Sequence, residues 1–358
     1  MSLRRKNGDP PMKTDERIGV GFVGAGAVVK TIHVPVLGQM AQEFRIEAVW
    51  DINTSAAESL AQQVGARVIP GFEEMLADPR VEVIVVATPA GCHAEHVAAG
   101  MRAGKRAILC EKPFGSSLDD IRLVEEAAAT SDVPLLIGAM HAFDPGWSAI
   151  SETVAHMREQ AVAIRSSIVL PFNERFEQWA TELPPRAPPE LDAEDIAMLL
   201  MRMGIMELAI HDLPLVRAMI PEGAPITVTS AMPLEPFGYA ISLSAGDRVI
   251  DLFGYIHDSW KPSWELEAVS ADQSLCLEFT PSFVHAGSAT ARISGTLETD
   301  IVGPFARNGY QMEWQAIREL ARGRPFPIPP LAQVIGDFRF ALDIVEQSCA
   351  KIAAGAGQ

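Results

Sequence analysis

The first third of the chain alternates short apolar runs with segments of helical periodicity. The apolar runs are rich in valine and isoleucine and nearly free of charge, which is typical of parallel strands buried on both faces. Because strands and helices alternate, the pattern predicts βαβ units that build a doubly wound parallel sheet. The predicted strands are Ile18–Val23, Ile46–Trp50, Val83–Ala87, Ala107–Cys110 and Leu135–Ala139.

The pattern of apolar positions changes after about residue 140. Helical periodicity predicts a helix over Trp147–Arg158 and, beyond a proline-rich stretch, a long apolar helix that ends near Arg217. Short runs of strand-forming residues separated by turn residues then extend from Ile226 to Ile293, and they predict a mainly antiparallel sheet. Two further helices are expected near Gln311–Arg322 and Leu331–Ala354.

These patterns together predict an α/β domain followed by an α+β domain. A chain of 358 residues is long enough for two domains of ordinary size. We expect a flexible tail at residues 1–16, the α/β domain at 17–140 and the α+β domain at 141–330. The remaining residues, 331–358, are expected to form a C-terminal helix that packs back toward the first domain.

Composition and charge limit the kinds of partner that the chain is expected to bind. The formal net charge of −17 disfavours binding to nucleic acid or to an anionic membrane surface. No apolar run is long enough to span a membrane, and the polar first residues lack the apolar core of a signal peptide. The cysteines fit neither a zinc site nor a compact disulfide framework, so we expect no metal, reduced thiols and a cytoplasmic location. They are Cys92, Cys110, Cys276 and Cys349.

A glycine-rich turn ends the first predicted strand. Gly24 permits a tight turn, and Gly26 lets the backbone approach a pyrophosphate, which would meet the free N–H groups at the start of the next helix. Val29 stands where the third glycine of this dinucleotide-binding fingerprint belongs, so a glycine turn in any βα unit is the alternative. The residues expected to line the pyrophosphate are Gly24, Ala25, Gly26, Ala27 and Val28.

Residues at the ends of two further strands extend this predicted site. Asp51 follows the second strand, where a carboxylate accepts hydrogen bonds from the ribose hydroxyls of adenosine. Ile52 offers no positive charge for a 2′-phosphate, so we expect NAD in preference to NADP. Thr88 and Pro89 follow the third strand at the same edge of the sheet. His93, just beyond them, suits a cofactor contact and an ordinary helix-start histidine equally well.

A tripeptide after the fourth predicted strand makes the chain recognisable. Glu111–Lys112–Pro113 follows Ala107–Cys110 and, together with the glycine turn and residues 87–105, resembles the Gfo/Idh/MocA oxidoreductases. The C-terminal part is similar to the same family in Tyr310–Trp314, in Gly323–Pro325 and in the last helix. The resemblance therefore covers nearly the whole chain.

The resemblance implies an N-terminal Rossmann domain and a C-terminal domain whose antiparallel sheet leaves one face open. It implies hydride transfer between NAD, or alternatively NADP, and a small polar substrate such as a sugar, a cyclitol or a sugar acid. It also implies a homo-oligomer, since an open sheet face tends to be covered by another subunit.

The resemblance gives the lysine of the tripeptide a catalytic role. In the family this lysine contacts the substrate and the ribose next to the nicotinamide, which implies that role for Lys112, with Glu111 beside it in the cofactor site. A lysine near the reacting carbon can hydrogen-bond the substrate oxygen and stabilise developing negative charge. The alternative is a solvated surface lysine.

The family's second catalytic motif is an aspartate, a glycine two residues later and a histidine four residues after the aspartate. This chain has Glu207, Ala209 and His211 at those positions. Because residues four apart share one helix face, Glu207 and His211 are expected to face one site, where the histidine would act as general acid or base. Glu207 reaches one methylene further than aspartate, which would suit a different substrate. The alternatives are a hydrogen-bonded helix histidine and half of a metal site.

Other positions near these motifs leave their roles open. Ala142 stands where the family usually has an arginine, and His141 beside it could serve the nicotinamide or cap the next helix. The methionines that precede His211 suit either the core or a pocket wall. The segment Leu183–Pro189 could fold over the substrate or only connect two elements. Aromatic residues before it suit packing or sugar stacking: Phe172, Phe176 and Trp179.

Three functions follow from these observations. The first is an NAD(P)-dependent dehydrogenase or ketoreductase of sugar-like alcohols, in which Lys112 polarises the substrate oxygen and His211 exchanges its proton. The second is an NAD-binding regulatory protein without catalysis, motivated by Glu207, Ala209 and Ala142. The third is an enzyme that retains NAD and uses a transient oxidation to cleave a glycosidic bond.

Overall fold

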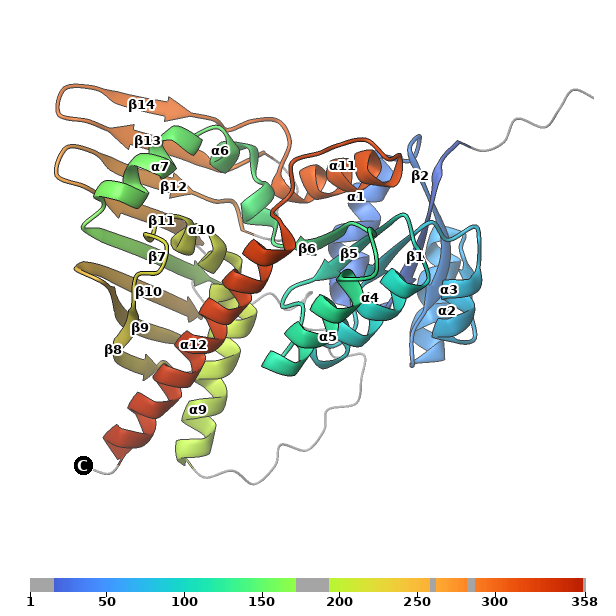
Figure 1. The fold of residues 1–358 in the computed structure, drawn as a ribbon, viewed down its shortest axis with the longest axis horizontal. Helices are drawn as coiled ribbons and strands as arrows, with labels where there is room; N and C mark the ends of the chain where they lie inside the picture. The colour runs from blue at the N-terminus through green and yellow to red at the C-terminus, as the bar shows by residue number, and fades with distance from the viewer. Residues whose placement is uncertain (1–15, 172–192, 258–261, 282–286, 357–358) are drawn as a thin grey trace, which may run out of the picture.

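The computed structural model describes residues 16–171, 193–257, 262–281 and 287–356. Two sheets, each with its own helices, lie side by side (Figure 1). Residues 1–15 of the predicted tail at 1–16 lie outside the described residues, as do the stretch Leu183–Pro189 and the aromatic residues Phe172, Phe176 and Trp179.

The first sheet has six parallel strands in the order β3-β2-β1-β4-β5-β6. The chain runs from β1 to one edge, returns, and continues from β4 to the other edge, which is the doubly wound Rossmann arrangement. This confirms the fold class predicted for the N-terminal part. The strands are β1 (Ile18–Val23), β2 (Phe44–Trp50), β3 (Arg67–Val68), β4 (Val83–Val86), β5 (Ala107–Glu111) and β6 (Leu135–Gly138). The helices are η1 (Val29–His33), α1 (Val34–Gln39), α2 (Thr54–Val64), α3 (Phe72–Ala77), η2 (Ala90–Cys92), α4 (His93–Arg102) and α5 (Leu118–Ala128).

Helices cover both faces of this sheet because its central strands are apolar on both sides. On one face α4 approaches β5 so closely that a Cβ added at Gly100 would lie 3.0 Å from Ile108. Glu111 is three residues further along β5 and therefore on the other face. That face is covered by α11 (Gly309–Ala321), which comes from the far end of the chain and packs on β5 and β6.

The strand ends differ from the prediction by one or two residues, and one difference affects the site. β5 continues to Glu111, so Lys112 is the first residue beyond the strand, at the carboxyl edge of the sheet. β3 was not predicted, because Arg67 and Val68 form only two residues of edge strand and carry no apolar run.

The second sheet has eight strands in the order β14-β13-β12-β11-β7-β10-β9-β8. β7 and β10 are parallel, and the other neighbouring pairs are antiparallel, which confirms the mainly antiparallel sheet. The strands are β7 (Ala163–Leu170), β8 (Ile226–Pro233), β9 (Phe237–Ala245), β10 (Arg248–Ile256), β11 (Ser263–Val269), β12 (Ser274–Glu278), β13 (Thr290–Ser294) and β14 (Thr299–Val302).

The central strand β7 is the main feature that the sequence did not reveal. Its burial alternates along the strand, but a polar residue, Ser166, occupies one of the buried positions. Ser166 is buried there because its hydroxyl donates a hydrogen bond to Oδ2 of Asp212 at 2.7 Å. The apolar alternation that would have marked the strand is therefore interrupted by a tertiary hydrogen bond. The edge strand β14 was missed as well, since its residues are mostly exposed.

The helices of the second half are more broken than predicted. The helix expected over Trp147–Arg158 is two short helices, and the long helix expected to end near Arg217 is interrupted by a π turn and a 3₁₀ turn. Pro214 begins the last piece, where its missing N–H and bulky ring prevent a continuous α-helix. The segments are η3 (Met140–Phe143), α6 (Pro145–Ser148), α7 (Ser151–Gln160), α9 (Ala193–Met203), η4 (Gly204–Leu208), η5 (Ala209–His211), α10 (Leu213–Ala218) and α12 (Leu331–Ala356).

The last helix, α12, begins beside the first domain and then runs along the second (Figure 1). Near its start the ring of Phe338 lies 4.7 Å from that of Phe114, centroid to centroid, and further along the helix packs on α9, α10 and β8. Among the described residues, no helix combines the length and the apolar character that crossing a membrane requires. All four cysteines are free thiols.

Replacing Leu109 by alanine should destabilise the first domain. Leu109 lies in β5 and is fully buried, so its truncation removes apolar contacts and leaves a cavity, at a cost of about 2–5 kcal/mol. The measurement is chemical denaturation of the full chain. Leu118→Ala is the matched control, because that leucine is 55% exposed and its loss should change the free energy of unfolding by less than about 0.5 kcal/mol. Equal effects of the two substitutions would contradict this packing.

Candidate active site

The turn after β1 contains two glycines that serve different purposes. Gly24 has a φ of +110°, and a Cβ added there would lie 2.5 Å from the carbonyl oxygen of Ala87. Gly26 has no described atom within 4 Å of an added Cβ, so the protein's own packing does not require glycine at this point. An open approach to the backbone is what a bound pyrophosphate needs.

The helix that follows the turn presents free N–H groups. Lys30 donates to the carbonyl oxygen of Gly26 at 3.3 Å, so Ala27 and Val28 precede the first bonded N–H group. Val28 also lines the cleft described below. The predicted pyrophosphate residues thus lie together at one helix end, and this arrangement fits a dinucleotide.

Asp51 lies just past β2 and is tied to the glycine turn. Its Oδ2 accepts a hydrogen bond from the backbone N–H of Ala25, and its Oδ1 accepts one from that of Asn53, both at 2.7 Å. Each carboxylate oxygen keeps a second lone pair for a ribose hydroxyl. Ile52 beside it is 89% exposed and apolar, so this residue supplies no positive charge to the outer side of Asp51.

His93 holds two loops of the site together. It is buried, with Nε2 2.5 Å from the carbonyl oxygen of Thr88 and Nδ1 2.7 Å from that of Pro113. Both contacts can be hydrogen bonds only when both ring nitrogens carry hydrogen, since a carbonyl oxygen only accepts. His93 therefore connects the loop of Thr88 and Pro89 to the loop of Lys112 and also lines the cleft.

The neighbouring His96 packs among aromatic rings. Its ring contacts those of Phe72 and Trp50, with centroids 4.5 and 5.7 Å away. Its Nδ1 lies 3.2 Å from the hydroxyl oxygen of Thr88. The residue therefore belongs to an aromatic cluster beneath the loop after β4.

Glu111 is a buried carboxylate held by a chain of hydrogen bonds. Trp314 can only donate, so its Nε1–H bonds to Nδ1 of His33 at 3.2 Å, and Nε2–H of His33 then donates to Glu111 at 2.9 Å. Burial alone would raise the pKa of Glu111, but the hydrogen bond from His33 and the nearby Lys112 outweigh it and lower the pKa. Glu111 is thus an ion that fixes the end of β5.

Lys112, Glu207 and His211 meet in a cleft of about 290 Å³ at the carboxyl edge of the first sheet. Nζ of Lys112 donates to the backbone carbonyl oxygen of Glu207 at 2.9 Å. Burial lowers the pKa of Lys112, and the carboxylates of Glu111 and Glu207 oppose that shift only in part. The cleft is also lined by Val28, Ile32, Ala87, Thr88, Ala90, His93, Glu111, Pro113, Gly138, Met140 and Tyr310.

The contacts of His211 indicate which of its ring nitrogens can accept a proton. Nδ1 lies 3.1 Å from Sδ of Met140, and a thioether sulfur only accepts, so the contact is a hydrogen bond when Nδ1 carries the hydrogen. In the neutral ring Nε2 is then the basic nitrogen. Burial, together with Lys112 and His141 nearby, lowers the pKa of His211 well below its usual value. The ring is therefore neutral near pH 7 and able to accept a proton.

The helix that carries Glu207 and His211 is not the regular α-helix that their spacing suggested. Glu207 lies in the π turn η4 and His211 in the 3₁₀ turn η5, yet both line the same cleft. Such turns place side chains differently from an α-helix and are frequent at functional sites. Of the methionines before His211, Met201 and Met206 are buried in the core.

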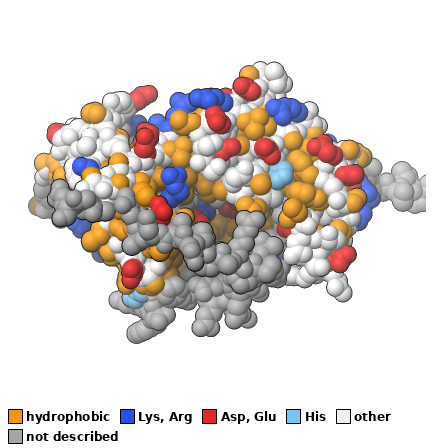
Figure 2. Space-filling view, turned by 90° about the horizontal axis from the view of Figure 1, so that it is seen from below, with side chains coloured by type: hydrophobic (Ala, Val, Ile, Leu, Met, Phe, Trp, Pro, Cys, Tyr) orange, Lys and Arg blue, Asp and Glu red, His pale blue; other side chains and the backbone are white. Residues whose placement is uncertain are grey.

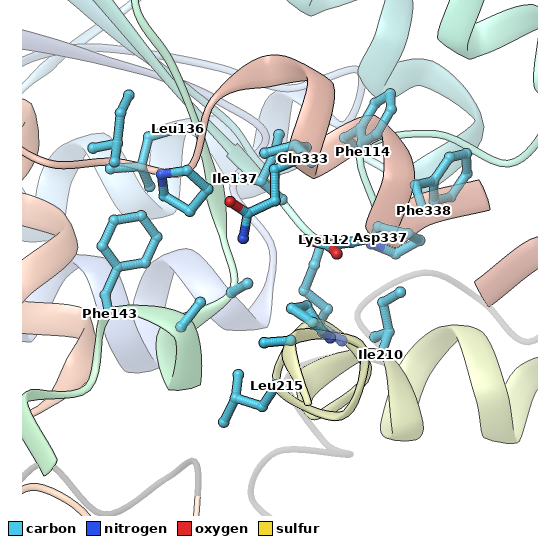
Figure 3. Close-up of a pocket in the computed structure, with 18 of the residues that line it drawn as sticks. Lys112, Phe114, Leu136, Ile137, Phe143, Ile210, Leu215, Gln333, Asp337 and Phe338 are labelled. Atoms are coloured by element: carbon cyan, nitrogen blue, oxygen red, sulfur yellow. The ribbon is translucent and has the colours of Figure 1, made fainter. Parts of the chain in front are cut away.

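A second cavity, of about 110 Å³, lies on the other side of Lys112 (Figure 3). Its walls are mostly apolar and come from β6, α10 and the start of α12, with Phe114 and Phe338 among them. Ala142 lines this cavity, so an arginine there would place a charge among apolar side chains. None of its lining residues belongs to the glycine turn, and it shares Lys112 and Pro113 with the cleft.

Several residues of the site carry no local sequence pattern that marks them as functional. Met140 and Tyr310 line the cleft, His33 and Trp314 hold Glu111, and Asp212 organises the residues behind His211. Asp212 directly follows the motif histidine, and Tyr310 and Trp314 lie in a motif that was noted only as a resemblance. Their roles arise from contacts between residues far apart in the chain.

Charged side chains of both signs are mixed on one face of the molecule, and the described residues contain no metal-binding cluster. Figure 2 shows basic, acidic and apolar side chains intermingled on the face seen there, without a basic patch. Within the described ranges, no group of three or more histidine, cysteine, aspartate or glutamate side chains is placed to hold a metal ion.

Comparison with known proteins shows what the first domain is similar to. Residues 18–139 match the Gfo/Idh/MocA profile, described as an oxidoreductase family with an NAD-binding Rossmann fold. An inositol 2-dehydrogenase from Saccharopolyspora erythraea is 33% identical over 138 residues, which are 38% of this chain and 40% of that protein. The chain therefore matches less than half the length of this curated relative.

Solved structures match over nearly the whole chain at lower identity. A UDP-N-acetylglucosamine 3-dehydrogenase from Acidithiobacillus ferrooxidans aligns with 94% of this chain and 99% of its own, with a TM-score of 0.67 and 18% identity. A variant of a 3-ketoreductase from Actinomadura kijaniata, solved with NADP, aligns with 92% of this chain and 98% of its own, with a TM-score of 0.68 and 14% identity. Both domains of this chain therefore share their fold.

The two glycines of the turn should respond differently to substitution. Gly26→Val should leave the unliganded protein as stable as the wild type but weaken NAD binding at least tenfold, because its side chain would occupy the approach to the backbone. Gly24→Ala should instead destabilise the fold, because of its positive φ and the nearby Ala87 carbonyl. Calorimetric titration with NAD and thermal unfolding measure the two effects. Unchanged NAD affinity in Gly26→Val would exclude this turn as the pyrophosphate site.

Proposed function

We propose that the chain, whose residues 18–139 match the Gfo/Idh/MocA oxidoreductases, transfers a hydride between a nicotinamide dinucleotide and a carbon bearing a hydroxyl group. One observation carries the proposal. Lys112, Glu207 and His211 come from two domains and converge in one cleft, next to the turn of Gly24 and Gly26. Residues without a common chemical role would have no reason to meet there.

The first domain would hold the dinucleotide. The N–H groups after Gly26 suit the pyrophosphate, and Asp51 suits the adenosine ribose. Thr88, Pro89 and Glu111 lie along the same sheet edge and would form the rest of this site, together with His93 and Lys112. When bound, the nicotinamide supplies the carbon that accepts or returns the hydride.

The protein's own groups would handle the oxygen and its proton. In oxidation, Nε2 of His211 takes the hydroxyl proton while the C–H bond gives up its hydride and a carbonyl forms. Lys112 hydrogen-bonds the same oxygen and stabilises its negative charge. In reduction His211 returns the proton. The lowered pKa of His211 favours the neutral, proton-accepting ring that oxidation requires.

A polyol is the substrate class that we propose, with a cyclitol, a sugar or a sugar acid as candidates. Similarity to an inositol 2-dehydrogenase and to a UDP-N-acetylglucosamine 3-dehydrogenase supports it. Glu207 is exposed in the cleft, and its carboxylate can accept hydrogen bonds from neighbouring hydroxyls of such a ring.

We further propose that the chain forms a homo-oligomer through the second sheet. Helices cover one face of this sheet (Figure 1), whereas the other carries partly exposed apolar side chains such as Val249 and Val269. A second copy would remove these side chains from water. Sedimentation of the full chain measures this directly.

Turnover with a panel of cyclitols, sugars and sugar acids tests the proposed function. Once a substrate is found, Lys112→Ala and His211→Asn should each lower kcat/KM by roughly 10²–10⁴-fold, since each removes a group that acts on the reacting oxygen. Production of reduced nicotinamide is the measurement. His156→Asn is the matched control, because this histidine pairs with Asp272 at the surface, away from the cleft.

The panel also separates the two rival functions. NAD binding without oxidation of any polyol would favour a regulatory protein. Glycosidic bond cleavage with bound NAD and no net reduced cofactor would favour the NAD-retaining enzyme. Unchanged turnover after substitution of Lys112 or His211 would remove that residue from the mechanism.

Cofactor preference should depend on the residue after Asp51. The wild type should bind NAD more tightly than NADP, because Asp51 repels a 2′-phosphate and Ile52 offers it no charge. Ile52→Arg should shift the ratio of affinities toward NADP at least tenfold, whereas Ile52→Met should leave it unchanged. Titration of each variant with both cofactors gives the ratio. A wild type that prefers NADP would contradict the assignment of Asp51.

A further inference from the structure

A buried network lies directly behind His211 and is not used by the mechanism above. Its centre is Asp212, which is 1% exposed. Asp212 accepts hydrogen bonds from Nδ1–H of His141 at 2.8 Å and from the hydroxyl of Ser166 at 2.7 Å. Nε1–H of Trp264 also donates to it, with both carboxylate oxygens within 3.0 Å. A buried carboxylate with these donors is a satisfied ion.

Two of these partners also contact His211. The ring of Trp264 meets that of His211 edge-on at 5.5 Å, and the ring of His141 lies 6.1 Å from it, centroid to centroid. His141 is in turn held by stacking on Phe279, with centroids 3.8 Å apart and planes inclined by 16°. The network thus fixes one side of the His211 ring, while Met140 binds its Nδ1.

The bond to Asp212 also determines how His141 is protonated. A carboxylate only accepts, so Nδ1 of His141 must carry hydrogen, and Nε2 remains for another partner. His141 lines a cavity of about 20 Å³, which is large enough for one water molecule. Asn308 lines the same cavity and is 5% exposed. Its Oδ1 accepts from the N–H of Gln311, whereas its Nδ2 is buried without a hydrogen-bond partner.

From this geometry we infer that Asp212 and His141 form a positioning pair for His211, completed by one water molecule between Nε2 of His141 and Nδ2 of Asn308. The pair holds the His211 ring in place. Burial is the main cause that lowers the pKa of His211, Lys112 adds to it, and His141 contributes as well, so loss of His141 should let that pKa rise. The other ionisable groups that line the cleft with His211 are Lys112, Glu207, Glu111, His93 and Tyr310.

Histidine-selective ¹⁵N NMR tests the pair without any substrate. In the wild type His141 should carry hydrogen on Nδ1, and His211 should titrate below the usual histidine midpoint of ~6.5. In Asp212→Asn the new amide can donate to Nδ1 of His141, so the hydrogen should move to Nε2. Asp272→Asn, in the surface pair with His156, is the matched control and should change neither signal of the buried pair.

A second variant keeps the test decisive if Asp212→Asn does not fold. His141→Gln leaves the bonds of Ser166 and Trp264 to Asp212 intact and should raise the His211 midpoint alone. An unmoved His211 midpoint, or wild-type His141 with its hydrogen on Nε2, would overturn the pair. A high-resolution crystal structure should show water within hydrogen-bond distance of His141 and Asn308, and a dry cavity would overturn that part.

The expected effect on catalysis rests on the proposed function, but the NMR result can be judged without it. With an identified substrate, His141→Gln should move the acid limb of the kcat/KM profile to higher pH. Absence of turnover with every polyol would count against the proposed function, whereas the NMR result would still decide the pair. A normal pH profile despite a raised His211 midpoint would show that His211 is not the catalytic base.

Discussion

The buried carboxylate of Glu111 is the constraint on which the arrangement of the two domains depends. A carboxylate at the end of an apolar strand stays charged only when hydrogen-bond donors accompany it. His33 supplies the direct donor, and Trp314 fixes the tautomer of His33 from α11. These bonds connect the first helix, β5 and a helix from the far end of the chain. Lys112 comes next in the sequence and is thereby held at the mouth of the cleft.

The second half of the site depends on an interrupted helix. Pro214 prevents a continuous α-helix, and the chain passes through a π turn and a 3₁₀ turn before it resumes. These turns direct Glu207 and His211 into the cleft, while Asp212 points to the opposite side and binds the sheet through Ser166 and Trp264. Adjacent residues, His211 and Asp212, therefore face the cleft and the sheet respectively.

The two domains that form the cleft resemble known proteins to different extents. The family profile matches only residues 18–139, which contain the glycine turn, Asp51 and Lys112. Beyond that match, solved dehydrogenase and ketoreductase structures share the fold of both domains at 14–18% identity over nearly the whole chain. Glu207 lines the cleft, whereas Ala142 and His141 line two other cavities.

The sequence alone was sufficient for the features that depend on local patterns. Continuous apolar runs predicted five of the six parallel strands, because burial on both faces leaves no place for charge. The glycine turn and Asp51 were identified because each lies where a strand ends, whereas Lys112 was identified from the resemblance of Glu111–Lys112–Pro113 to a family motif. Tertiary structure alone decided the rest. β7 was hidden because buried Ser166 is paired with a residue 46 positions away. The roles of His33, Met140 and Asp212 likewise come from contacts across the chain, and no local pattern records a partner that is distant in sequence.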